Sequence, residues 1–267
     1  MINLGSVQET MLLPLWGRAV ETQKDKPLLV DNKAVSIINS IPYDFTKISK
    51  RIRKLSSASW IARSIFFDNK ILEFINAHPF ATVVNVGCGL DTTFERIDNG
   101  YIHWIDLDLP DAIELRKQYF QESERRRLVA KSVFDSSWYE EIPQKDNVML
   151  LVAGVLYYFE ETDVRRLFKD IHSYIPSAEI IFDHASKFGI KLSNEQVIKR
   201  GGLDESAFLK WGIDDIFEIE KWESYIKVIS NMPMFKEFRK NYPFNKRIGM
   251  RISDGLKVMS LAHILIS

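Results

Sequence analysis

The sequence predicts an α/β fold built on a doubly wound, mostly parallel sheet of seven strands. Short apolar runs that suit buried strands alternate with helical patterns along most of the 267 residues. One of these runs stops at the turn Gly87–Cys88–Gly89, and acidic residues follow the next run roughly 20 residues later. Such alternation favours parallel strands that are joined by right-handed crossovers.

The composition limits the class of protein and its partners. With 46% hydrophobic residues the chain can bury a large core, and 36 basic residues balance 36 acidic ones, so we expect neither nucleic acid nor membrane as a partner. The single cysteine, the lack of a secretory leader pattern and the shortness of every apolar run predict a cytoplasmic protein. A small molecule is the expected partner, and the oligomeric state cannot be predicted.

The chain is predicted to open with a helical cap over residues 1–57, where three prolines interrupt mixed polar and apolar residues. A long helix is expected over residues 58–77, before Pro79. Its predicted inward side carries apolar residues at the helical period, namely Ile61, Ile65, Leu72 and Ile75.

The first half of the sheet follows. Four strands are predicted, at residues 81–86, 101–107, 128–132 and 147–153. A helix is expected to begin at Pro110, because proline is tolerated in the first helical turn, and to run to about Arg126.

The second half of the chain is predicted to complete one domain over residues 58–267. A helix over 160–174 would bury Val164, Leu167, Phe168 and Ile171, and a fifth strand would cover 179–184. Residues 186–222, which include Gly201–Gly202, break this alternation and are predicted to form an insertion over the carboxyl edge of the sheet. Two late strands, at 225–229 and 256–266, would enclose a helical piece at 234–239.

The glycine turn and the acid after the second strand carry the chemistry of the prediction. Two glycines let the backbone approach a ligand closely, although a strand can also end in such a turn without any ligand. Asp91 and Thr92 stand where a dinucleotide motif needs a further glycine, which argues for a cofactor without a pyrophosphate. Asp108 could accept both ribose hydroxyls of a nucleoside, or it could simply cap the following helix.

Three blocks of the sequence, VVNVGCGLDTTFERI, HWIDLDLPDAIELRK and LVAGVLYYFEETDV, resemble the leucine carboxyl methyltransferase family, which also includes polyketide O-methyltransferases. The resemblance covers about residues 58–185. It implies the seven-stranded, Rossmann-like class I methyltransferase fold, S-adenosylmethionine as the cofactor, and methyl transfer to a carboxylate or hydroxyl oxygen.

The resemblance also implies which residues bind the cofactor. Arg63 would hold the methionine carboxylate, for which a guanidinium group is well suited, and Asp108 would hold the ribose. The other implied positions are Gly87, Cys88 and Gly89 in the turn, Asp106 two residues before Asp108, Ser132 and Val133 beside the adenine, and Ala153. Ala153 departs from the family pattern, which has an acid there, so the family's protein phosphatase substrate is not carried over.

The catalytic residues are not determined by the sequence. Tyr157, Tyr158, Asp183 and His184 are acceptor-side candidates because they lie at the carboxyl ends of predicted strands. His184 could equally be a strand-end histidine without a catalytic role, and Tyr157 and Tyr158 are expected to shape the pocket, at least one of them as part of the core. Glu205 and Trp211 could form a lid. Residues Arg125–Arg127 are interpreted as a solvated helix end rather than an RNA contact, Cys88 has no partner base, and no ligand spacing predicts a metal.

Three functions remain open. The leading one is an S-adenosylmethionine-dependent O-methyltransferase that acts on a small molecule. The second is a non-catalytic scaffold or regulatory module that binds S-adenosylmethionine or S-adenosylhomocysteine. The third is a nicotinamide-dependent enzyme on the same architecture, against which the missing glycine counts.

Overall fold

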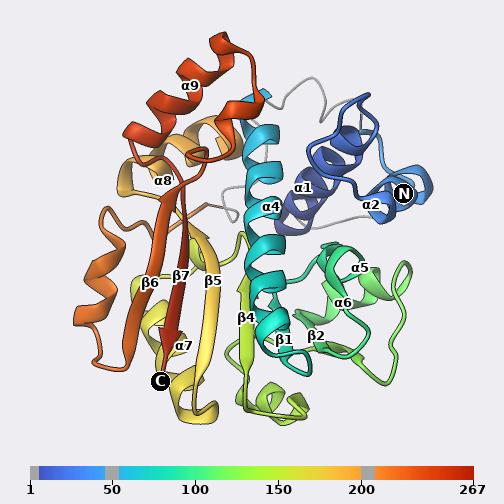
Figure 1. Cartoon of the computed structure of the whole chain (residues 1–267), viewed down its shortest axis with the longest axis vertical. Helices are drawn as coiled ribbons and strands as arrows, with labels where there is room; N and C mark the ends of the chain where they lie inside the picture. Colours follow the sequence, from blue (N-terminus) through green and yellow to red (C-terminus); the bar gives the residue numbers. More distant parts are fainter. Residues whose placement is uncertain (1–5, 46–53, 200–207) are drawn as a thin grey trace.

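The computed structural model describes residues 6–45, 54–199 and 208–267, and the α/β fold with seven strands is confirmed (Figure 1). The strands form one sheet in the order β3-β2-β1-β4-β5-β7-β6, in which β7 is antiparallel to both of its neighbours and the other pairs are parallel. The strands are β1 (Thr82–Val86), β2 (His103–Asp108), β3 (Arg126–Ala130), β4 (Val148–Val152), β5 (Ala178–His184), β6 (Ile226–Pro233) and β7 (Ser260–Ile266).

Helices cover both faces of the sheet, and Figure 1 shows α4 crossing in front of β4 and β1. Val83 and Met149 pack with the α4 residues Phe67 and Ile71, whereas Val84 packs on the other face with residues of α7. The two faces form because successive strand residues point to opposite sides. The described helices are α1 (Ser6–Thr22), α2 (Asn32–Ser40), α4 (Lys54–Ala77), α5 (Thr93–Ile97), α6 (Pro110–Lys117), α7 (Glu161–Tyr174), α8 (Lys187–Ser193) and α9 (Phe244–Gly255).

Several predicted elements are confirmed closely. Helix α7 buries the four predicted residues, Val164, Leu167, Phe168 and Ile171, against the sheet. Strands β1 and β4 are buried along their whole length, as their unbroken apolar character indicated. Helix α6 begins at Pro110 as predicted.

Other predicted boundaries are wrong. Helix α6 ends at Lys117, far short of Arg126, and the third strand starts at Arg126 rather than at residue 128. The arginine run was interpreted as a solvated helix end, yet Arg126 is buried because it pairs with Asp106 and Glu95. On α4, the predicted inward residue Leu72 is exposed, and Ile71 is buried in its place.

The end of the chain also differs from the prediction. Residues 234–238 form turns, followed by the 3₁₀ turn η6 (Arg239–Asn241) instead of a longer helical piece. Helix α9 was not predicted, and because it extends to Gly255, the last strand begins at Ser260 rather than at residue 256.

The segment between β5 and β6 lies where the insertion was expected. It contains α8, the π-helical turn η3 (Asn194–Lys199) and the 3₁₀ turn η5 (Ile216–Lys221), whereas the Gly201–Gly202 pair lies outside the described residues. The division into a cap, a main domain and an insertion stays a prediction. Among the described residues, no helix combines the length and the apolar character that crossing a bilayer would need.

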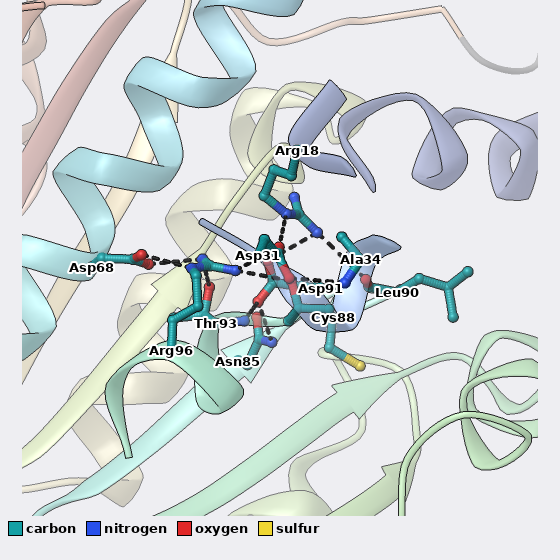
Figure 2. A network of polar contacts seen from close by, with 12 residues as sticks. Arg18, Asp31, Ala34, Asp68, Asn85, Cys88, Leu90, Asp91, Thr93 and Arg96 are labelled. Carbon is teal, nitrogen blue, oxygen red and sulfur yellow. Dashed lines mark hydrogen bonds and ion pairs between the residues drawn. The ribbon is translucent and has the colours of Figure 1, made fainter. Parts of the chain in front are cut away.

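A buried ionic network joins the N-terminal helices to the loop that follows the glycine turn (Figure 2). Asp31 caps α2 by accepting from the Ala34 amide at 2.9 Å, and its other oxygen accepts from Arg18 of α1 at 2.8 Å and from Arg96 at 2.9 Å. Arg96 also donates to both oxygens of Asp68 on α4, at 2.7 and 2.8 Å. Three helices are thereby tied to residues 91–96.

Asp91 lies at the edge of the same network. Burial opposes its ionisation, but the nearby Arg18 and Arg96 outweigh that effect and lower the pKa of Asp91 to about 2. Its Oδ1 accepts from the Thr93 amide at 2.8 Å, which fixes the start of α5. Asp91 pairs with Arg18 of α1, and the Thr92 hydroxyl donates to Asp31. The two residues that stand in place of glycine therefore attach the loop to the N-terminal helices.

Replacing Asp31 with alanine should destabilise the protein by about 3–5 kcal/mol, because two buried guanidinium groups would lose their shared partner. The matched control is Asp98→Ala, which breaks a half-exposed ion pair with Arg125 and should cost less than about 1 kcal/mol. Urea denaturation followed by circular dichroism measures both. Equal losses for the two variants would show that the network does not hold the helices.

Candidate functional site

A cavity of about 860 Å³ opens at the carboxyl ends of the parallel strands, where doubly wound sheets bind their ligands. Residues after β1, β2, β3, β4 and β5 all contribute to its wall. The wall is completed by α1, α4 and α9 and by a largely apolar set of residues, which includes Trp60, Leu192, Leu209, Met234, Phe235, Ile252, Leu256 and Met259.

The glycine turn forms one part of this wall. Gly87 and Gly89 both line the cavity, and both have left-handed backbones, with φ of 62° and 43°. A Cβ atom on Gly87 would collide with a methyl group of Val155, and one on Gly89 would lie 3.1 Å from Met11. Glycine is therefore needed here both for the backbone conformation and for the space.

Asp108 connects the end of β2 to the glycine turn. Its Oδ2 accepts a hydrogen bond from the Gly89 amide at 2.7 Å, and its Oδ1 accepts one from the Leu109 amide at 2.7 Å. Burial raises the pKa of Asp108, although both amide donors oppose that shift. The structure thus places two features that the sequence singled out, the turn and the acid, side by side in the cavity wall.

Asp106 lies elsewhere, and the structure gives no support to its predicted contact with a cofactor. Its carboxylate is fully buried and is not part of the cavity wall. It accepts from four side chains within the fold, namely Asn85 at 3.2 Å, Trp104 at 2.9 Å, Arg116 at 2.9 Å and Arg126 at 2.9 Å. Residues of a strand alternate between its faces, so Asp106 and Asp108 share a side, but only Asp108 reaches the open end of the sheet.

Cys88 also points away from the cavity. Its side chain is buried with Ile113 and Leu128, and burial raises the pKa of the thiol well above its ordinary value. Only its two glycine neighbours contribute to the wall. The expectation that Cys88 is no nucleophile agrees with this environment.

The remaining predicted cofactor residues line the cavity. Ser132 and Val133 follow β3, and Ala153 follows β4, so they belong to the strands on either side of the glycine turn and the β2 end. Ala153 brings no charge to the wall, and the next residue, Gly154, has a left-handed φ of 78°. A Cβ atom on Gly154 would lie 2.8 Å from Arg63.

Arg63 reaches the cavity from α4 and pairs with Asp183 at the end of β5. Its Nη1 donates to Asp183 at 2.8 Å. Burial by itself lowers the pKa of the Arg63 guanidinium, but the nearby carboxylate of Asp183 outweighs this effect, so the pKa is raised. Asp183 also accepts from the Gly154 amide at 2.6 Å and from the Tyr157 hydroxyl at 3.1 Å. A carboxylate from β5 therefore stands beside the position where Ala153 lacks one.

The candidate bases differ in their access to the cavity. Tyr157 and Tyr158 line it, and burial together with Asp183 raises the pKa of Tyr157 well above its ordinary value. His184 is buried outside the cavity wall, its ring is 3.0 Å from Asn231, and burial lowers its pKa. Trp211 is buried in the core rather than placed as a lid, and Glu205 lies outside the described residues.

Sequence reasoning missed the wall that α9 supplies. Gly249, Ile252, Ser253 and Leu256 line the cavity, together with Met234 and Phe235. The sequence does contain a helical pattern here, because Ile248, Ile252 and Leu256 recur at every fourth position. The charged residues between them obscured this pattern.

Comparisons with known proteins agree with this architecture. The model of the family described as leucine carboxyl methyltransferase matches residues 12–172, and so includes the N-terminal helices that the sequence resemblance left out. The tetracenomycin polyketide synthesis O-methyltransferase TcmP of Streptomyces glaucescens is 28% identical over 221 residues, which is 82% of this chain and 80% of TcmP.

Two further proteins are similar over most of the chain. The S-adenosyl-L-methionine-dependent methyltransferase dpfgK of Gibberella zeae is 23% identical and covers 96% of this chain and 93% of its own. The crystal structure of a putative methyltransferase from Thermobifida fusca superposes with a TM-score of 0.56 at 12% identity, covering 94% of each chain. At that identity the superposition shows the shared fold.

Replacing Gly87 with alanine should destabilise the protein by more than the same change at Gly100. Both backbones are left-handed, which costs an alanine about 1–2 kcal/mol, but the space around Gly100 is open whereas Gly87 faces Val155. We expect the collision to add about 1–3 kcal/mol in urea denaturation, part of which Val155→Ala should recover in a double-mutant cycle. Equal losses at Gly87 and Gly100 would contradict the close approach at the turn.

Proposed function

The chain belongs to the leucine carboxyl methyltransferase family, and we propose that it transfers a methyl group to an oxygen atom of a small, mainly apolar molecule. It is an S-adenosylmethionine-dependent methyltransferase. The observation that carries the finer proposal is the joint position of Gly87, Gly89 and Asp108 in the wall of a mostly apolar cavity.

The cavity wall fits the parts of the cofactor. The glycine turn leaves the space that a Cβ atom would fill, and Asp108 keeps a carboxylate at the end of β2, where an acid binds ribose hydroxyls in related folds. In this proposal Ser132 and Val133, which line the cavity after β3, flank the adenine. Neither Asp106 nor the Cys88 side chain belongs to this proposed site.

Arg63 is the proposed partner of the cofactor's carboxylate. It is the cation that α4 brings to the cavity, and Asp183 fixes one of its nitrogen atoms by a 2.8 Å hydrogen bond. Lys131, which also lines the cavity, is engaged by the Ser137 carbonyl at 3.2 Å and by Glu141. Asp183, which accepts from the amide of Gly154, is the carboxylate that we propose to act beside the uncharged Ala153.

The cavity wall also constrains the acceptor. When bound, S-adenosylmethionine supplies an electrophilic methyl group. An acceptor oxygen bonds to this carbon as the carbon–sulfur bond breaks, and any proton that the oxygen carries must pass to a base before or during this step. Among the described lining residues there is no histidine or cysteine, and Tyr157 keeps its own proton because its pKa is raised.

We therefore propose an acceptor whose oxygen is ionised near neutral pH, such as a carboxylate or an acidic phenol. Asp183 does not serve as the proton acceptor in this proposal, because three donors already occupy it. The role of the cavity is then to hold the oxygen in line with the methyl group and to exclude water.

Isothermal titration tests the cofactor site. S-Adenosylmethionine and S-adenosylhomocysteine should bind to protein freed of retained ligand, whereas NADH should not. Asp108→Ala should weaken both affinities by roughly 10- to 150-fold, the range for a hydrogen bond to a charged group. Asp98→Ala, which removes a carboxylate far from the cavity, is the control and should bind as the unmodified protein does.

Unchanged affinity in a folded Asp108→Ala variant would contradict the proposed ribose contact. Tight binding of both ligands without turnover over a broad acceptor panel would favour the non-catalytic scaffold instead. Binding of NADH in preference to either ligand would contradict the cofactor assignment.

The pH dependence of methyl transfer tests the proposed acceptor class. For a series of aromatic carboxylates and phenols of graded acidity, kcat/KM should fall on the acid side at a pH that moves with the acceptor's own pKa. Carboxylates should react across the neutral range, and the corresponding neutral alcohols should react far more slowly. An acid limb that stays at one pH for every acceptor would reveal a base on the protein and contradict the proposal.

A further inference from the structure

Helix α9 and the residue that follows it, Leu256, carry a line of exposed apolar side chains. Phe244, Ile248, Ile252 and Leu256 follow one another at four-residue intervals and are 70%, 46%, 58% and 51% exposed. Residues at this spacing lie along one side of a helix, and in a globular protein such a side normally faces the core. Here the buried positions of α9 are Met250 and Asp254 instead.

The same segment is strongly basic, although the whole chain has no net charge. Residues 239–257 contain six basic side chains, Arg239, Lys240, Lys246, Arg247, Arg251 and Lys257, and a single acidic one, Asp254. Asp254 is buried and is engaged by Arg239 at 3.2 Å. The expectation that no membrane is bound rested on the overall balance, which conceals this local charge.

The apolar line is continuous with the cavity. Ile252 and Leu256 line the cavity and are also exposed, whereas Phe244 and Ile248 extend the line outward. Figure 1 shows α9 at one end of the molecule, on the opposite end from the C-terminus. An apolar ligand that enters or leaves the cavity at this end would pass along α9.

We propose that α9 docks this protein on the surface of an anionic lipid bilayer. Phe244 and Ile248 enter the interface between headgroups and acyl chains, while the exposed Lys246 and Arg251 contact lipid phosphates. A helix that projects apolar side chains outward needs a deformable apolar layer rather than a preformed groove. A second copy of the chain fits poorly, because two equally basic surfaces would face each other across a symmetric interface.

The docking itself is independent of methyl transfer. The orientation that it imposes, with the cavity facing the bilayer, rests on the proposed function, because it would let an apolar acceptor pass from the lipid to the site. Vesicle binding can be measured without cofactor or acceptor, so failure of one proposal is distinguishable from failure of the other.

Cosedimentation of the full chain with vesicles tests the docking. The protein should sediment with phosphatidylcholine vesicles that also contain phosphatidylglycerol, and much less with phosphatidylcholine alone. Phe244→Ser/Ile248→Ser should weaken binding about tenfold or more, because it removes apolar area from the interface. Lys246→Glu/Arg251→Glu should abolish the preference for the anionic lipid, since each basic residue is worth roughly fivefold at such a surface.

A matched control is available in another apolar pair. Phe80 and Tyr101 are 63% and 59% exposed and lie in contact with each other, away from α9. Phe80→Ser/Tyr101→Ser should leave vesicle binding unchanged, and thermal unfolding with S-adenosylmethionine titration verifies that every variant is folded.

Equal sedimentation of the α9 variants and the unmodified protein would overturn the proposal. So would equal binding to the two kinds of vesicle. Self-association of the unmodified protein in light scattering, lost in Phe244→Ser/Ile248→Ser and accompanied by no vesicle binding, would assign the surface to a second copy instead.

Discussion

The shared carboxylate of Asp31 is the interaction on which the arrangement of the site depends. It accepts from Arg18 and Arg96 in a position where its side chain is fully buried, and it also caps α2. Breaking one member of such a network leaves the others charged and without water. The network therefore fixes α1 and α2 against the loop after the glycine turn, and α1 in turn contributes Met11, Leu13 and Pro14 to the cavity.

Two acids on one strand serve different purposes because of their depth. Asp106 lies within β2 and neutralises the buried Arg116 and Arg126, so it stabilises the fold from inside. Asp108 lies at the last position of the strand, where its two amide contacts leave it in the cavity wall. The two acids thus combine a structural ion cluster with a proposed ligand contact, and the sequence alone does not show how deeply each acid is buried.

Burial also separates the features of this chain that were predictable from those that were not. Elements with a clear period and a buried face, such as α7 and β4, were predictable because burial requires an uninterrupted apolar face. Gly87, Gly89 and Asp108 were predictable as a group because chain order places strand ends together, whereas Arg63 on α4 was implied by the family resemblance. What could not be predicted depends on partners that are distant in sequence. Arg126 is buried because Asp106 and Glu95 pair with it, and Arg63 meets Asp183 across 120 residues.

The cavity wall is divided along the chain. All the residues of the proposed cofactor site from Arg63 to Ala153 fall within residues 12–172, the part that the family model matches, whereas an apolar section of the wall from Leu192 to Met259 lies beyond it. Natural selection can therefore act on the two sections separately. Related proteins can keep one ancestral way of holding the methyl donor while the C-terminal section diverges, so that new acceptor preferences arise through replacement of about one third of the gene rather than through redesign of the whole site.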